Sequence, residues 1–157
     1  MTTPPRRRRR VWRWIFGSLA ALVLAAGVGL VVWSQVGVMS AEAEPLAAVR
    51  ADDRIAIAET GEAIVMSPAA GASSVGLVFI PGAKVEAWAY ASTLSALVTE
   101  DNMTVVITRP ILNLAFFDLR PLTTFTNLAP DVQTWLFGGH SLGGVRACQF
   151  ANEVSGL

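Results

Sequence analysis

The segment TWLFGGHSLGG, residues 134–144, decides the fold of this chain. It opens with a short apolar run that favours a β-strand, and a helix-like stretch follows Gly144. Between them Gly139-His140-Ser141-Leu142-Gly143 fits G-x-S-x-G, the pattern of a serine on a sharp turn from strand to helix. Such a turn needs glycines wherever a Cβ would collide with the closely approaching backbones. The segment therefore predicts a nucleophilic hydroxyl on Ser141, projected above a sheet.

A simpler interpretation is that Ser141 only caps the following helix, because serine is a favoured N-cap residue and glycine is common in turns. A cap does not require glycines on both sides of the serine. Here four glycines flank it, namely Gly138, Gly139, Gly143 and Gly144. We therefore favour the nucleophile and keep the cap as the alternative.

A serine at the start of a helix lies where unpaired N–H groups and the helix dipole favour negative charge. An oxyanion formed at Ser141 would be stabilised there, and the N–H of Leu142 is one expected donor. The second donor is expected from the loop after an earlier strand. Gly82-Ala83-Lys84 is the candidate loop, with the N–H of Ala83 favoured.

Two stretches on the N-terminal side of this segment predict further buried strands. VGLVFI at residues 75–80 and MTVVIT at 103–108 are continuous apolar runs, typical of strands buried on both faces. Between them, residues 85–99 place apolar side chains at three- and four-residue spacings, which predicts an amphipathic helix that lies on the sheet.

The remaining stretches complete the pattern. Residues 54–59 and 63–66, split by Thr60-Gly61, predict an antiparallel hairpin. Residues 111–128 are interrupted by proline and predict an irregular stretch with a short helix. The alternation of strands and helices indicates an α/β fold with an incomplete, doubly wound and mostly parallel sheet.

The N-terminal part predicts a membrane anchor. From Trp14 to Trp33 the chain runs without a charge over about 30 Å of helix, which matches the hydrocarbon thickness of a bilayer. The arginines before it place the N-terminus in the cytoplasm by the positive-inside rule, so the body lies outside. We expect a basic cytoplasmic N-terminus at 1–13, a transmembrane helix at 14–35, a linker at 36–51 and a partial α/β domain at 52–157.

Two further interpretations of this region stay open. Ala41-Glu42-Ala43 is an A-x-A-like site, so a cleaved secretory signal with a mature N-terminus near Glu44 is the alternative, although the apolar run is long for one. Within the span, small residues recur every four positions, a spacing that permits weak helix–helix association. These residues are Gly17, Ala21, Ala25 and Gly29.

Charge and composition exclude other classes of function. The net charge is zero, yet six of the twelve basic residues lie in the leader (Arg6 to Arg10 and Arg13), which leaves six basic against twelve acidic residues in the rest. An acidic body is not expected to bind nucleic acid. Cys148 is the only cysteine, so no intramolecular disulfide or cysteine-ligated metal cluster is expected, and we expect no cofactor.

GLVFIPGAKV at residues 76–85 together with WLFGGHSLGG at 135–144 resembles the α/β-hydrolase superfamily, and in particular a bacterial group described as fold-5. The resemblance extends from about Asp52 to Leu157. It implies a serine hydrolase that acts on a small acyl substrate, an ester, thioester or small amide. It also implies that Ser141 is the nucleophile and that Ala83 and Leu142 occupy the oxyanion-hole positions.

Three residues near these segments have more ordinary interpretations. His140 is the only histidine, but neighbours in a sharp turn project apart, so it is not expected to act as the general base for Ser141. Lys84 could contact a substrate carboxylate, and more often such a lysine is simply solvated. Cys148 is expected to pack against the sheet.

The chain departs from the superfamily after Ser141, where sixteen residues contain one carboxylate, Glu153, and no histidine. The acid and histidine of the triad normally follow the nucleophile on later loops. We therefore expect a truncated N-terminal portion of a hydrolase, nearly inert as written because Ser141 keeps its proton without a base. A non-catalytic, membrane-anchored binding protein is the alternative, and the strained turn argues against it.

Overall fold

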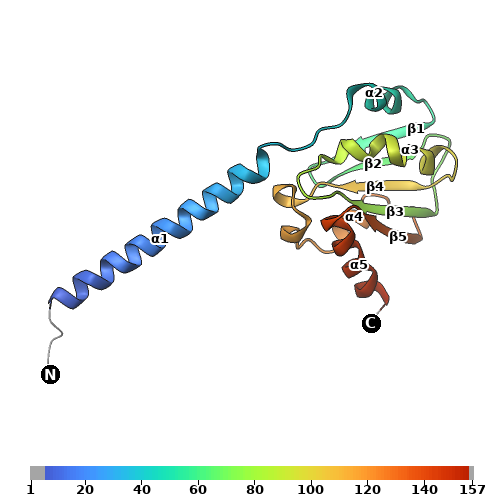
Figure 1. The fold of residues 1–157 in the computed structure, drawn as a ribbon. Helices are drawn as coiled ribbons and strands as arrows, with labels where there is room; N and C mark the ends of the chain where they lie inside the picture. Colours follow the sequence, from blue (N-terminus) through green and yellow to red (C-terminus); the bar gives the residue numbers. More distant parts are fainter. Residues whose placement is uncertain (1–5, 156–157) are drawn as a thin grey trace. The chain divides into compact units, whose positions relative to one another are not determined.

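The computed structural model describes residues 6–155, which divide into two compact units with a boundary between Val36 and Gly37. Residues 1–5, the start of the expected basic N-terminus, and residues 156–157 lie outside the described residues. The first unit contains helix α1 and the second contains a sheet with its helices (Figure 1).

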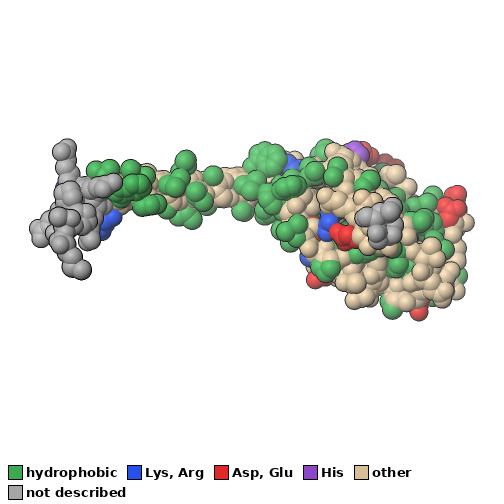
Figure 2. Space-filling view, turned by 90° about the horizontal axis from the view of Figure 1, so that it is seen from below, with side chains coloured by type: hydrophobic (Ala, Val, Ile, Leu, Met, Phe, Trp, Pro, Cys, Tyr) green, Lys and Arg blue, Asp and Glu red, His purple; other side chains and the backbone are tan. Residues whose placement is uncertain are grey.

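Helix α1 (Arg6–Gln35) contains the predicted apolar span. Its stretch from Arg10 to Gln35 is long and apolar enough to cross a membrane, and none of its apolar window is buried inside the structure. Figure 2 shows hydrophobic side chains along this helix, and Trp12 stacks on Phe16 with ring centroids 5.6 Å apart. A signal sequence near the N-terminus can meet the same criteria of length and composition, so α1 by itself does not distinguish a membrane span from a secretory signal.

The second unit is built on a mixed five-stranded sheet with the order β1-β2-β4-β3-β5. The strands are β1 (Ile55–Glu59), β2 (Ala63–Pro68), β3 (Val75–Ile80), β4 (Thr104–Thr108) and β5 (Thr134–Gly139). The predicted hairpin of β1 and β2 is antiparallel, as is the pair of β2 and β4. Strand β3 pairs in parallel with β4 and with β5, so the parallel part of the sheet is the half that ends in the serine turn.

Helices cover both faces of this sheet (Figure 1). The elements are α2 (Ala43–Ala51), the 3-10 turns η1 (Ala87–Tyr90), η2 (Ile111–Asn113) and η3 (Ala115–Phe117), and the helices α3 (Ala91–Thr99), α4 (Thr123–Thr126) and α5 (Leu142–Ser155). The α/β class is confirmed, and the helix predicted at residues 85–99 forms as η1 followed by α3. Residues 111–128 are irregular with one short helix, as expected.

Two hydrophobic cores lie on opposite faces of the sheet, and β4 contributes to both. Val105 and Ile107 point into the core beneath α2 and α3, whereas Val106 points into the core beneath α4 and α5. All five residues of β4 are buried. A continuous apolar run was therefore the correct signal for this strand, because it has no solvent-facing side.

Residues 36–51, which we expected to form a linker, include helix α2. Val49 is 5% exposed, and Leu46 and Ala41 pack against the core on the α3 face. The prediction missed this helix because only a few apolar side chains mark its inner face, and their burial depends on the distant partners that the sheet supplies.

Candidate active site

The turn between β5 and α5 holds Ser141 in a strained conformation. Its backbone φ is +53°, in the left-handed region that residues other than glycine and asparagine rarely adopt. The residue is exposed. A capping serine accepts a hydrogen bond from the first turn of its helix, whereas the hydroxyl of Ser141 has no hydrogen-bond partner in the part of the chain that the structure describes. The geometry does not support the helix-cap interpretation.

Close backbone contacts explain two of the four flanking glycines. A Cβ placed on Gly143 would lie 2.1 Å from the carbonyl oxygen of Ile80 and 2.5 Å from that of Pro81, at the end of β3. A Cβ on Gly139 would lie 2.5 Å from the backbone of Gly143. These distances are far below van der Waals contact and involve backbone atoms, so both positions require glycine.

The other two flanking glycines are less constrained. A Cβ on Gly144 would be 3.3 Å from the oxygen of Gly139, a tight contact. One on Gly138 would meet the nearest side-chain atom, in Leu77, at an ordinary 3.4 Å. The crowding is therefore concentrated at the two glycines of G-x-S-x-G itself.

The loop after β3 brings the second candidate oxyanion donor to this turn. His140 N–H donates to the oxygen of Ile80 at 3.1 Å, which ties the serine turn to the end of β3. Immediately after Ile80 come Pro81 and Gly82, both buried, and then Ala83 and Lys84, both half-buried. The two predicted donor residues, Ala83 and Leu142, thus lie on two segments that the hydrogen bond between His140 and Ile80 joins.

The amide N–H groups of Ala83 and Leu142 share one property. Among residues 6–155, neither donates a hydrogen bond to a backbone or side-chain acceptor. In contrast, the neighbouring amides are occupied: Gly82 N–H donates to the Tyr90 hydroxyl at 3.1 Å, and Lys84 N–H donates to the oxygen of Asn113 at 2.8 Å. Two half-buried N–H groups without acceptors can receive a developing negative charge.

His140 contacts Tyr90 rather than Ser141. Its Nδ1 lies 3.0 Å from the Tyr90 hydroxyl, which also accepts the Gly82 N–H. A Cβ on Gly82 would lie 2.7 Å from the same Nδ1, so the imidazole packs closely on the loop after β3. The expectation that His140 is not the base for Ser141 stays a prediction. Tyr90, the only tyrosine of the chain, was missed because residues 90 and 140 meet only in the tertiary fold.

Lys84 and Cys148 differ from their simplest interpretations. Lys84 is half-buried and has a φ of +56°, so its backbone is part of the loop geometry rather than a freely solvated position. The expectation that Cys148 packs against the sheet is wrong, because its side chain is exposed. Ala147 and Phe150 face the core instead, which sets the phase of α5 so that Cys148 points to solvent.

An open groove of about 310 Å³ begins beside the serine turn. Helix α5 forms one wall with Leu142, Val145, Arg146 and Gln149, and the loop from Ala115 to Leu119 forms the other. Phe116 and Leu119 on that loop are 72% and 83% exposed. The groove therefore offers apolar surface directly next to the residue that follows Ser141.

An ion pair between the buried Asp118 and the half-buried Arg120 holds the loop wall of this groove in place. Asp118 accepts two hydrogen bonds from the guanidinium of Arg120, at 2.7 and 2.5 Å, and these bonds raise the pKa of Arg120. Arg120 also donates to the oxygen of Arg109 at 2.7 Å, and its own oxygen accepts from Arg146 of α5 at 3.3 Å. The loop is thus held between β4 and α5.

The region with this geometry is also the region that matches a protein-family model. A sequence profile described as the alpha/beta hydrolase family matches residues 76–157, which are 82 of the 157 residues and extend from β3 through α5. No curated protein and no solved structure matches the chain.

Proposed function

The chain belongs to the alpha/beta hydrolase family, and from this premise we propose that it is a serine hydrolase that works through an acyl-enzyme at Ser141. The observation that carries the proposal is the conjunction at one turn of a strained, exposed serine with two unpartnered amides from separate segments. Strain of this kind persists where the surrounding structure enforces it, and it is concentrated at functional sites.

The chemistry follows from these groups. The Ser141 oxygen attacks the acyl carbon of an ester, thioester or small amide, and the carbonyl oxygen takes the negative charge between the N–H groups of Ala83 and Leu142. The bond to the leaving group then breaks, and the proton that the Ser141 hydroxyl gives up passes through solvent to the leaving group. Water later adds to the acyl carbon, which releases the acid and returns a proton to the Ser141 oxygen. The apolar groove beside Leu142 suits a substrate whose acyl part is hydrophobic.

Proton transfer limits what the described residues can do. No described side chain hydrogen-bonds the hydroxyl of Ser141, and His140 Nδ1 is engaged with Tyr90. Without a base the serine keeps its proton at neutral pH, and the oxyanion hole alone supplies only residual catalysis. We therefore expect the 157-residue chain by itself to turn over substrate close to the background rate.

The alternative function is that of a non-catalytic, membrane-anchored binding protein. The observation in its favour is the same unpartnered hydroxyl of Ser141, because a working serine nucleophile normally contacts its base. Against it stands the strain at Ser141, which a binding surface does not need.

The proposal includes the location of the enzyme. We infer that residues 14–35 within α1 are a retained anchor that contacts lipid, with the arginine-rich end in the cytoplasm and the sheet unit outside it. The small-residue stripe of α1 permits a weak association between two such helices. N-terminal sequencing of the native protein tests retention, because a mature N-terminus near Glu44 would show that the segment is a cleaved signal and the body a secreted protein.

A fluorophosphonate probe tests the serine chemistry. The oxygen of an activated serine displaces fluoride from phosphorus, so the full chain in detergent is expected to gain one adduct at Ser141, slowly because no base assists. Peptide mapping by mass spectrometry locates the adduct.

Two controls make this labelling decisive. Ser141→Ala removes the oxygen and is expected to abolish the adduct, and unfolding in urea is expected to abolish it as well, because the unfolded chain has no oxyanion hole. Labelling that persists in Ser141→Ala would assign it to another residue. No labelling of the folded chain would favour the binding-protein alternative.

A further inference from the structure

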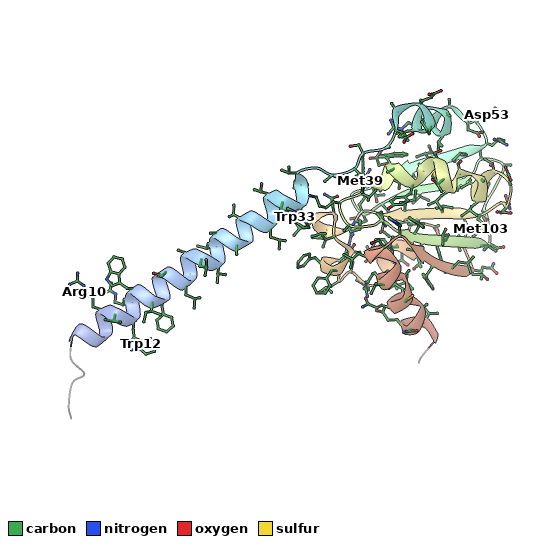
Figure 3. The ribbon with its side chains drawn as sticks, viewed as in Figure 1. Arg10, Trp12, Trp33, Met39, Asp53 and Met103 are labelled. Atoms are coloured by element: carbon green, nitrogen blue, oxygen red, sulfur yellow. The ribbon has the colours of Figure 1, made fainter. Side chains whose placement is uncertain are left out.

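The segment just before α2 is hydrogen-bonded to the candidate oxyanion loop. Met39 forms an isolated parallel bridge with Val85: its N–H donates to the oxygen of Lys84 at 2.8 Å, and its oxygen accepts from Glu86 N–H at 2.9 Å. Ala41 N–H reaches the carboxylate of Glu86 at 3.4 Å. Figure 3 labels Met39 on the extended stretch between α1 and α2. Residues 39–41, here called the brace, are thus joined to residues 84–86 by one isolated β-bridge and one contact to a carboxylate.

The backbone of Lys84 is hydrogen-bonded on both sides, by the brace and by Asn113. Lys84 N–H donates to the oxygen of Asn113 at 2.8 Å, while the Lys84 oxygen accepts from Met39. The φ of Lys84 is +56°, a conformation that is strained for a residue with a side chain and persists only where the surrounding structure enforces it. The hydrogen bonds with Asn113 and Met39 hold the backbone of Lys84 on both sides.

Ala83 lies between two residues that are held by hydrogen bonds: Gly82 N–H donates to the Tyr90 hydroxyl, and Lys84 is bonded on both sides. Releasing Lys84 from its left-handed conformation would free one end of this short segment, so that the peptide group carrying the Ala83 N–H could reorient. That amide is a useful donor only while it points at the place where the oxyanion forms, because oxyanion stabilisation depends on fixed donors.

We propose that Met39, through its backbone, is a positioning residue of the oxyanion hole: the brace clamps Lys84 and thereby fixes the Ala83 N–H. The role of the amide rests on the proposed function, whereas the clamp on Lys84 stands on the contacts alone. Met39 follows the last residue of α1 by four positions, so the segment that continues from the anchor is part of the site.

The proposal bears directly on processing of the N-terminus. Cleavage after Ala43, at the A-x-A-like site, would separate the brace covalently from the unit that it stabilises and would cut at the first residue of α2. A brace with three hydrogen bonds to residues 84–86 therefore belongs to a form in which the leader is retained.

Proline substitution in the full chain tests the brace. Met39→Pro removes the N–H that donates to Lys84. Ser40→Pro is the matched control, because it introduces the same ring one residue later, where the N–H has no partner among the described residues. Met39→Ala keeps the N–H and changes only an exposed side chain.

Two readouts are combined, amide hydrogen exchange by NMR in detergent micelles and the rate of fluorophosphonate labelling. Met39→Pro is expected to speed exchange of the Lys84 and Glu86 amides by about tenfold through local opening. It is expected to slow labelling at Ser141 on the order of tenfold, because a donor is misplaced. Exchange at Val78 and Val106 in the core is expected to stay unchanged, and both control variants are expected to behave like the original chain.

The outcomes separate the brace from the proposed function. Unchanged exchange at Lys84 in Met39→Pro overturns the brace, and faster exchange with unchanged labelling overturns its positioning role. If the original chain does not label at Ser141, the proposed function fails, while exchange at Lys84 still decides whether the clamp exists. If Met39→Pro loses core protection, Glu86→Ala removes only the contact to Ala41 and is expected to give a smaller change in the same direction.

Discussion

At the scale of single residues, the serine turn places a demand on the backbone that serine meets poorly. A φ of +53° costs a residue with a Cβ of order 1–3 kcal/mol, and glycine reaches the same conformation without steric penalty. The chain nevertheless has serine at position 141 between glycines that are required by contact. The hydroxyl is therefore retained against the local preference of the backbone.

This conflict predicts different stabilities for two substitutions that both remove the hydroxyl. Ser141→Gly is expected to raise the free energy of unfolding by about 1 kcal/mol relative to Ser141→Ala, because alanine keeps the Cβ and the strain. Urea denaturation of both variants in the same detergent measures the difference. Equal stability would mean that the left-handed conformation carries no cost.

How much of the site could be predicted from sequence depends on how far apart in the chain the contacting residues lie. Gly139 and Gly143 follow from the geometry of a local turn, so their crowding could be argued from the motif. The hydrogen bonds of Tyr90 with His140 and with Gly82 link three segments that are separate in sequence. No sequence pattern predicts these bonds. Cys148 was placed wrongly because a helix wheel needs its phase, which Phe150 and Ala147 set by packing in the core.

At the scale of elements, the same distinction separates the strands from α2. Strands β3 and β4 were predicted because a buried strand carries its own signal in every residue. Helix α2 was missed because its packing face is small and becomes buried only when it contacts α3 and the sheet. Local patterning thus identified the elements of the family's core, while elements at its periphery required the fold.

The junction of α2 and β1 gives a prediction at this scale. The Arg54 side chain and then its backbone N–H hydrogen-bond Asp52, the C-cap of α2, and they lower the pKa of that carboxyl from 3.8 to about 2. Because the folded pKa is below the unfolded one, this contribution to stability is fully present above about pH 4 and is lost as the pH falls toward 2.

A carboxyl carbon titration by NMR checks the junction. Arg54→Ala is expected to return the pKa of Asp52 toward 3.8, since both side-chain bonds are lost. Arg50→Ala is the matched control, because Arg50 lies over the ring of Trp88 and does not bond Asp52. An unshifted titration in Arg54→Ala would assign the low pKa to another cause.

At the scale of the whole molecule, the sheet is unevenly protected. Strands β1 and β5 are the two edge strands, and β5 carries the serine turn at its end. The exposed residues of β1 are small or charged, namely Ala56, Ala58 and Glu59. Leu136 in β5 is 50% exposed, and among the described strands β5 pairs only with β3. An exposed apolar strand at a sheet edge is a template for pairing with another chain.

We therefore expect the 157-residue chain to self-associate through β5. Leu136→Lys places a charge on the edge strand and is expected to shift the chain toward monomers, because a charge there opposes edge-to-edge pairing. Leu119→Lys makes the same change at a loop residue that is more exposed, at 83%, and lies outside the sheet. Light scattering in detergent compares the two variants with the original chain. If Leu119→Lys reduces association as strongly as Leu136→Lys, the association depends on general surface hydrophobicity. A loss confined to Leu136→Lys places the contact at the edge, next to the strand from which Ser141 is presented.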